Sequence, residues 1–338
     1  MSPGVLLAAF AAAVPARAKA PAEPAAPSVE PARAIREPVR LTAGATNELM
    51  GTLSPDEKAL YFVSDASGTL DIMRQSPVQS GPVTLSNSLG DAAWPRISPD
   101  GTKLAYLSFQ TDSTGNACVR PIENGKLGEE KCLTGPGSAE LMVLWWDDRS
   151  LAVLSRAELH GDFRLLRVPV DGSAPSTLVA RDMVGLALSP DRRWLAYIPL
   201  SKASADVGVT FAQRTGVGIA LQRLASGANP ASGSPTSSSE EGAPVLYTPT
   251  LPGVTGSVAF SEKGDYLEFT QFLNDTNRDG VIDGDDNAVI FRVPFHANQA
   301  QPISAGDEPE QLTSARWDCH YPAPAKTRLI ASCSHEGS

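Results

Sequence analysis

The sequence has no cluster of lysine and arginine side chains. Its 28 basic residues are outnumbered by 38 acidic ones, which gives a net charge of −10 and an isoelectric point near 5.0. A surface that binds nucleic acid needs clustered basic side chains to neutralise the phosphates. We therefore expect no nucleic-acid partner.

Long apolar runs are also absent. No stretch reaches the ~20 apolar residues that a membrane-spanning helix needs, so we expect no membrane span. The shorter run Val5–Val14 is followed by Ala16-Arg17-Ala18, the small-x-small pattern of a signal-peptide cleavage site, although Met1–Gly4 carry no basic residue. We assign residues 1–18 to a signal peptide and expect a periplasmic or extracellular protein. Residues 19–40, rich in proline and alanine, are interpreted as a tether.

The usual signals of a hydrolase are missing. No serine has glycine both two residues before it and two residues after it, as a nucleophile elbow requires. Nothing in the sequence links a histidine to a serine or cysteine nucleophile. The histidines are scattered: His160, His296, His320 and His335. We therefore expect that the chain is not an enzyme and has no catalytic residues.

Cysteine is scarce, with four residues in 338. Cys118 and Cys132 are 14 residues apart, and so are Cys319 and Cys333. Each pair brackets a turn between two predicted neighbouring strands, where side chains come close enough for a disulfide. We favour these two local pairings, with free thiols as the alternative. A zinc site is disfavoured, because neither pair has a CxxC motif or a histidine at ligand spacing.

The informative presence is a repeated Ser-Pro-Asp motif, each copy four residues before a short apolar strand. The copies begin at Ser54, Ser98 and Ser189, and a degenerate copy, Trp146-Asp147-Asp148, lies between the last two. The four aligned aspartates, Asp56, Asp100, Asp147 and Asp191, are 44, 47 and 44 residues apart. A period of ~40–45 residues built from short strands is typical of a propeller blade. Because they repeat, we interpret these aspartates as turn formers.

We predict an all-β fold, a six-bladed β-propeller of four-stranded antiparallel blades across residues 41–338. In each repeat a strand that opens with a Leu-Thr or Thr-Leu pair precedes the strand into the Ser-Pro-Asp turn. The predicted blades are about 41–76, 84–124, 132–172, 177–225, 246–297 and 311–338. Residues 227–243, rich in serine, glycine and proline, are predicted to be a disordered loop.

The end of the sixth repeat lacks an outer strand, so the last blade is predicted to be incomplete. Two interpretations stay open. Either the segment near Ile35–Leu41 closes the ring, or the chain is a fragment of a longer protein.

The repeat resembles the WD-like repeats of TolB-type β-propellers, whose turn reads Ser-Pro-Asp-Gly before Leu-Ala-Phe/Tyr. Ser98-Pro99-Asp100-Gly101 before Leu104-Ala105-Tyr106 matches it in full. The resemblance covers residues 41–338 and implies a propeller that serves as a partner-binding platform, a gate beside a peptidase domain, or a sensor. The small α/β domain that precedes the propeller in TolB is replaced here by the Pro/Ala tether.

One segment carries a metal-binding pattern. Residues 275–286 match the calcium loop D-x-[DN]-x-[DN]-G and end in aspartate, as in the dockerin variant of the EF-hand loop. Oxygens at alternating positions of such a loop converge on one cation while the glycine makes the sharp turn. The alternative is an acidic hairpin loop without a metal. We predict a structural Ca²⁺ held by Asp275, Asn277, Asp279, Val281 (through its carbonyl), Asp283 and Asp286.

These observations predict an exported, non-catalytic binding or scaffold propeller, expected to be a monomer, with a protein, peptide or glycan partner. Trp145 and Trp146 are the aromatic pair considered for a ligand platform; we expect one to pack between blades and the other to approach the surface. Two alternatives remain: the propeller half of a larger two-domain peptidase, or part of a sensor protein, in either case truncated at Ser338.

Overall fold

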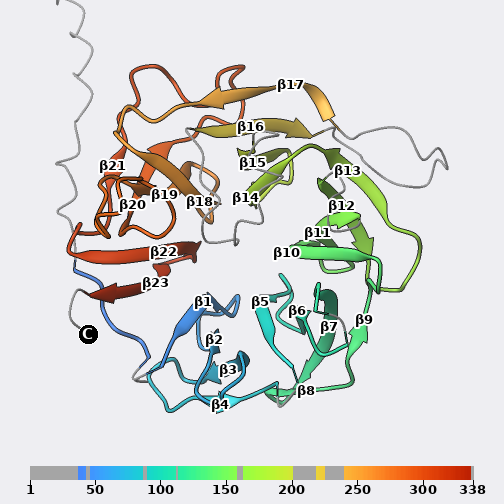
Figure 1. Ribbon diagram of the computed structural model, residues 1–338. Helices are drawn as coiled ribbons and strands as arrows, with labels where there is room; N and C mark the ends of the chain where they lie inside the picture. The colour runs from blue at the N-terminus through green and yellow to red at the C-terminus, as the bar shows by residue number, and fades with distance from the viewer. Residues whose placement is uncertain are drawn as a thin grey trace, which may run out of the picture. The chain divides into compact units, whose positions relative to one another are not determined.

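The computed structural model is an all-β assembly of small antiparallel sheets, and its described part contains no helix (Figure 1). The structure describes residues 37–42, 46–86, 90–111, 113–157, 163–200, 218–224 and 240–335. The predicted signal peptide, nearly all of the predicted tether and most of the predicted loop at 227–243 lie outside these residues. The last four residues of that predicted loop begin strand β17. In the described residues no helix is long and apolar enough to cross a membrane.

Six sheets surround a common axis, each with its first strand innermost (Figure 1). Blade one contains β1 (Glu48–Leu53), β2 (Leu60–Ser64), β3 (Asp71–Gln75) and β4 (Val83–Thr84). Blade two contains β5 (Ala92–Ile97), β6 (Lys103–Ser108), β7 (Asn116–Glu123), β8 (Lys126–Leu127) and β9 (Lys131–Cys132). Blade three contains β10 (Ser138–Asp147), β11 (Ser150–Ala157), β12 (Phe163–Pro169) and β13 (Ser176–Ala180).

The remaining blades follow in chain order. Blade four contains β14 (Met183–Leu188), β15 (Trp194–Pro199), β16 (Ile219–Leu224) and β17 (Glu240–Tyr247). Blade five contains β18 (Val254–Phe260), β19 (Tyr266–Phe272), β20 (Ala288–Pro294) and β21 (Glu310–Gln311). Blade six contains β22 (Trp317–Pro324) and β23 (Leu329–His335). The prediction of four strands therefore holds for four blades, while in the described residues blade two has five strands and blade six has two.

The predicted blade boundaries differ from the observed sheets. The strands at the Leu-Thr pairs were expected to open each repeat, but β4, β9, β13 and β21 are the outermost strands of the preceding sheets. Each of them is hydrogen-bonded to the third strand of its own blade, as Thr84 is to Met73. Each sheet therefore begins at the strand that enters the Ser-Pro-Asp turn.

The Ser-Pro-Asp turn is built by its own side chains. Ser98 Oγ donates to Asp100 Oδ1 (2.5 Å) and accepts from the backbone N–H of Lys103 (2.9 Å). Asp100 Oδ1 also accepts from the Thr102 N–H (2.9 Å), and Gly101 takes a left-handed φ of 75°. The Ser54 and Ser189 copies repeat these bonds, so the aspartates form turns, as their repetition predicted.

The turns of neighbouring blades meet on one face of the propeller, called here the turn face. The Asp100 N–H donates to Asp148 Oδ1 of the next blade (2.9 Å), and Arg192 Nε donates to the Trp146 carbonyl (2.7 Å). The strands after the turns are largely apolar because each lies between two blades; Leu151, Ala152, Val153 and Leu154 are fully buried. The opposite end of the propeller is called the loop face.

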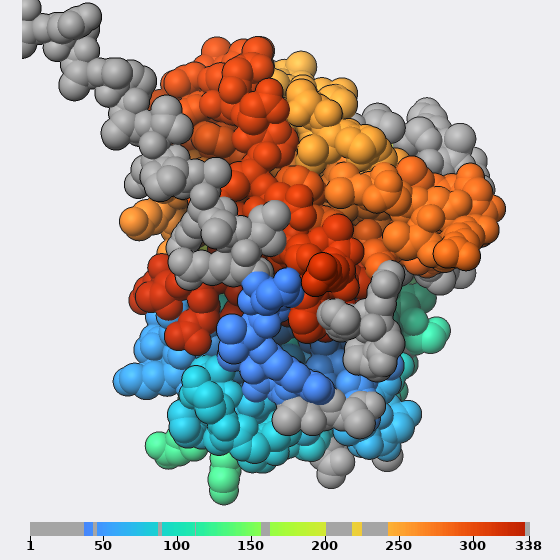
Figure 2. Space-filling view, turned by 90° about the vertical axis from the view of Figure 1, so that its left-hand side faces the viewer, coloured from blue at the N-terminus to red at the C-terminus, as the bar shows by residue number. Residues whose placement is uncertain are grey.

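Blade six joins blade one and closes the ring. The Met50 N–H donates to Ser332 Oγ (3.0 Å), and the Thr327 N–H donates to Glu57 Oε1 (2.9 Å). Residues 37–42 lie beside this junction, between blade six and blade one in the side view of Figure 2. Glu37 accepts from Trp317 Nε1. These residues contact both blades without forming a strand, so the ring is held by side-chain contacts at this point.

Both predicted disulfides are present. Cys118 lies directly opposite Cys132 in the β7–β9 pair, and Cys319 lies opposite Cys333 in the β22–β23 pair. Each bridge therefore ties two strands of one blade, as the spacing of 14 residues predicted.

Candidate functional site

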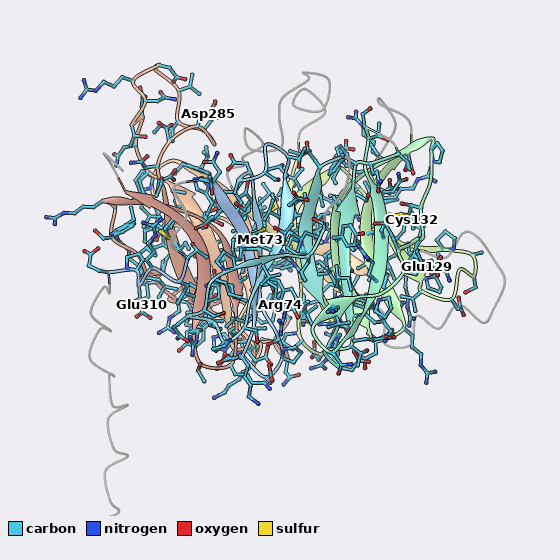
Figure 3. All side chains as sticks on the ribbon, turned by 90° about the horizontal axis from the view of Figure 1, so that it is seen from below. Met73, Arg74, Glu129, Cys132, Asp285 and Glu310 are labelled. Atoms are coloured by element: carbon cyan, nitrogen blue, oxygen red, sulfur yellow. A yellow bond between two sulfur atoms is a disulfide. The ribbon has the colours of Figure 1, made fainter. Side chains whose placement is uncertain are left out.

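The predicted calcium loop connects β19 to β20 on the loop face. Asp285 marks it in Figure 3, where the loop projects past the ends of the strands. The first half of the loop has the backbone frame that the motif requires. Gly280 has φ 91°, and its N–H donates to Asp275 Oδ2 (2.9 Å). Asn277 Oδ1 accepts from the Asp279 N–H (2.9 Å), and Asp279 Oδ1 accepts from the Val281 N–H (2.8 Å).

The last predicted ligand, Asp286, has a different environment. The residue is 2% exposed, and its Oδ1 accepts from the N–H groups of Thr276 (2.6 Å) and Asn277 (3.2 Å). Oδ2 accepts from the N–H of Asp283 (3.0 Å). Burial alone raises the pKa of a carboxyl, but these backbone donors outweigh it and hold the pKa of Asp286 below its usual value. Asp286 therefore fastens the two ends of the loop together.

The residues fit a calcium site in part. The Asp275, Asn277 and Asp279 side chains bond to the loop's own backbone, as the calcium-loop frame places them. Within the described part of the chain, however, carboxylate oxygens of three loop residues do not gather within 4.8 Å of one another. Ca²⁺ with bonds of about 2.4 Å would draw its ligand oxygens to within about that distance. Binding would thus require a small inward movement of these side chains.

The second candidate site lies at the propeller axis and was not predicted. The innermost strand of each blade has a register shift at an equivalent position, as between Ala93 and Arg96 in β5, and β10 has a second shift near its end. At this bulge the residues Met50, Trp94 and Tyr321 have left-handed φ angles of 57°, 56° and 53°. Such angles are costly for side chains with a Cβ, by roughly 1 kcal/mol or more each. The structure therefore holds three large side chains in unfavourable backbone conformations at one level of the axis.

These side chains form an apolar layer. Trp94 of blade two is 5% exposed, and its ring meets the ring of Tyr321 of blade six edge to face, with centroids 5.5 Å apart. Met50 of blade one packs against the same cluster. Burial raises the pKa of the Tyr321 hydroxyl.

Polar groups lie on the loop-face side of this layer. His320 Nε2 lies 2.6 Å from Asp318 Oδ1, and both side chains are partly exposed, at 25% and 28%. The imidazole contacts the rings of Phe272 and Tyr321, at centroid distances of 5.6 and 5.9 Å. Asp318 Oδ1 also accepts from the N–H of Ala288 (2.8 Å), the first residue of β20 and the second after the predicted calcium loop. This accessible spot thus combines an imidazole, a carboxylate and aromatic rings.

Of the residues singled out from the sequence, Trp145 is buried, at 6% exposed, and donates its Nε1 hydrogen to the Arg96 carbonyl (2.8 Å). Trp146 is half-buried under the guanidinium of Arg167. The turn aspartates remain turn residues. A repeated aromatic-proline pair, Trp94-Pro95 and Tyr321-Pro322, is the sequence signal that marks the bulge.

Comparisons with known proteins give the fold. No family model matches the chain, and no curated protein matches it. A gluconolactonase from Xanthomonas campestris is similar in structure, with a TM-score of 0.55, 12% identity and coverage of 87% of this chain and 86% of that one. A putative TolB from Agrobacterium tumefaciens is also similar, with a TM-score of 0.53, 15% identity and coverage of 87% of this chain and 92% of that one. A puromycin-hydrolysing peptidase of Mycobacterium tuberculosis matches with a TM-score of 0.49 and 17% identity over 87% of this chain. The chain spans 43% of the length of that peptidase.

The comparison confirms a β-propeller, and it corrects one expectation from the sequence. The absence of a nucleophile elbow led us to expect that the chain is not an enzyme. Proteins of similar structure include an enzyme, the gluconolactonase, so the expectation that this chain is not an enzyme is wrong. A missing nucleophile elbow does not exclude catalysis in this fold. The physical reason is that the fold fixes a scaffold, while chemistry depends on side chains from separate blades that meet at a site.

Proposed function

We propose that this chain is an exported binding propeller whose ligand site lies at the axis on the loop face, around His320 and Asp318. The left-handed backbone at Met50, Trp94 and Tyr321 carries this proposal. Strained backbone of this kind persists only where the surrounding structure enforces it, and it clusters at functional sites. Here the left-handed residues form the apolar layer. His320 contacts this layer through the Tyr321 ring, and Asp318 lies beside His320.

The chemistry of the site suits a protein, peptide or glycan partner. Phe272 and Tyr321 offer aromatic surface beside His320. The imidazole and the Asp318 carboxylate can exchange hydrogen bonds with hydroxyl or amide groups. Aromatic rings beside a few polar groups are typical of ligand sites. Two disulfides support an oxidising compartment outside the cytosol, in the periplasm or beyond the cell.

The Asp275–Asp286 loop is proposed to bind Ca²⁺ through Asp275, Asn277, Asp279, the Val281 carbonyl and Asp283. The ion would supply positive charge that offsets the repulsion between the loop carboxylates. Asp286 would keep its backbone bonds and fasten the loop. Because Ala288 donates to Asp318, an ordered loop would hold Asp318 in place beside His320.

The test is a screen on glycan and peptide arrays with the wild-type chain and His320→Ala. His296→Ala is the matched control, because His296 faces Asp307 at 3.2 Å in a loop after β20, outside the inner strands. We expect array binding by wild type and His296→Ala that His320→Ala loses. Equal binding by all three proteins, or none by wild type, would contradict the proposal.

A further inference from the structure

The axis carries a second polar group, the guanidinium of Arg96, on the turn-face side of the apolar layer. Arg96 follows Trp94 by two residues in β5, and its Cζ lies 5.4 Å from the centroid of the Trp94 ring. Its Nη1 donates to the carbonyl of Pro95 (2.9 Å). His320 precedes Tyr321 and Arg96 follows Trp94, so the two polar groups lie on opposite sides of the layer. This site is therefore independent of the one proposed above.

Arg96 differs from two other arginines that stack on rings, because each of those two has a carboxylate partner. Arg167 lies over Trp146 and pairs with Asp147 at 2.7 Å. Arg292 lies over Tyr266 and pairs with Glu310 at 2.6 Å.

Within the described residues, no carboxylate forms an ion pair with Arg96. The environment opposes its charge, since burial lowers the pKa of Arg96 to about 10. A guanidinium held in such surroundings without a counter-ion is costly.

The remaining nitrogens are available to a ligand. In the part of the chain that the structure describes, Nε and Nη2 of Arg96 make no hydrogen bond, and they are not among the polar atoms sealed from solvent. They therefore offer free N–H donors in a mostly enclosed position. Charge-assisted hydrogen bonds are strong in such positions because the local dielectric is low.

We propose that Arg96 is the anion-binding residue of a ligand site on the turn face of the axis, and that its ligand carries a single carboxylate. A guanidinium matches a carboxylate through two parallel N–H···O bonds. A phosphate dianion would need further cations, and a chain with a net charge of −10 disfavours multiply charged anions. The carboxylate could belong to a small organic acid or to the C-terminus of a peptide.

The indole resonances provide the test. Trp145 donates its Nε1 hydrogen to the Arg96 carbonyl, so its indole N–H signal in an NMR spectrum reports on this site. The probes are benzoate and acetyl-Ala-Ala with a free carboxylate, each compared with its uncharged amide. We expect the Trp94 and Trp145 signals to move with at least one free carboxylate and with neither amide. The signals of Trp194 and Trp317 should stay in place. Which carboxylate acts distinguishes the organic acid from the peptide terminus.

Variants then assign the effect to Arg96. Arg96→Gln should weaken carboxylate binding by about tenfold or more. Arg96→Lys, which keeps the charge, should retain part of it. Arg167→Gln removes an arginine that already has a carboxylate partner and should bind like wild type. The proposal is overturned if acids and amides act alike, if no probe shifts the two indoles, or if folded Arg96→Gln binds as tightly as wild type.

Discussion

Trp94 and Tyr321 come from blades two and six and meet edge to face across the inner strand of blade one, with ring centroids 5.5 Å apart. Both take a left-handed φ at the same bulge of their strands. This contact links blades that are not neighbours in the ring. It also lies between the His320–Asp318 pair and Arg96, the groups proposed to bind ligands at opposite faces of the axis.

The Trp94 ring is expected to contribute strongly to stability. Trp94→Ala removes a buried indole and should lower the free energy of unfolding by about 3 kcal/mol or more. Trp146→Ala, which removes a half-buried indole, should cost less. Urea denaturation measures both. Equal losses for the two variants would contradict the account of the axis.

Glu268 is predicted to destabilise the fold at alkaline pH. It lies in β19 at 7% exposed, opposite Arg292, whose guanidinium donates to Glu310 instead (2.7 Å). Burial raises the pKa of Glu268 to about 7, from 4.5 in the unfolded chain. A raised carboxyl pKa means that the stability contributed by the protonated form is present below pH 4.5 and is lost as the pH rises through 7.

Glu268→Gln removes this titration. It should leave the free energy of unfolding little changed near pH 5 and raise it by up to about 3 kcal/mol at pH 8. Glu310→Gln is the control and should destabilise, because it breaks the ion pair with Arg292. Denaturation curves across this pH range give the answer; a pH profile of Glu268→Gln parallel to that of wild type would refute the assignment.

The two disulfides should contribute similar amounts. Each closes a loop with a sequence separation of 14 residues, for which the loss of unfolded-chain entropy corresponds to about 3 kcal/mol. Replacing Cys118 and Cys132 with serine, or Cys319 and Cys333, should lower the unfolding free energy by about that amount in each case. A bridge whose removal leaves the denaturation midpoint unchanged would contradict this prediction.

Calcium is predicted to raise the melting temperature of the wild-type chain relative to a chelator. The double variant Asp275→Asn with Asp279→Asn keeps the acceptors for the loop backbone but loses two charges, so it should lose the calcium response. Asp285→Asn removes a charge outside the proposed ligand set and should keep it. A wild-type melting temperature that is the same with millimolar calcium and with chelator would refute the site.

The parts of the fold that depend on local chemistry could be predicted from the sequence. The Ser-Pro-Asp turn is made by residues within five positions of one another, as the bond from the Lys103 N–H to Ser98 Oγ shows, so its repeat identified the propeller. The disulfides followed from their spacing for the same reason. The outer strands could not be assigned, because a two-residue strand such as β4 carries no periodicity and its partner depends on the length of the connection.

The candidate site depends on residues that are far apart in the sequence. The environment of Arg96 depends on the lack, among the described residues, of an ion-pairing carboxylate from the neighbouring blades, and that of His320 depends on Phe272, 48 residues earlier. Asp286 matched the last position of a calcium loop. In the folded loop, however, three backbone N–H groups compete with a metal for its carboxylate, and the motif does not show which of them prevails. Pattern alone cannot resolve these choices.

The most direct test of the account is the affinity of the array-selected ligand for wild type, His320→Ala and His296→Ala, measured by calorimetry with calcium present. The account predicts about a tenfold loss for His320→Ala, since a hydrogen-bonding imidazole is removed from the site, and no change for His296→Ala. If His320→Ala binds as tightly as wild type, or if His296→Ala loses as much, the ligand does not bind at the loop face of the axis.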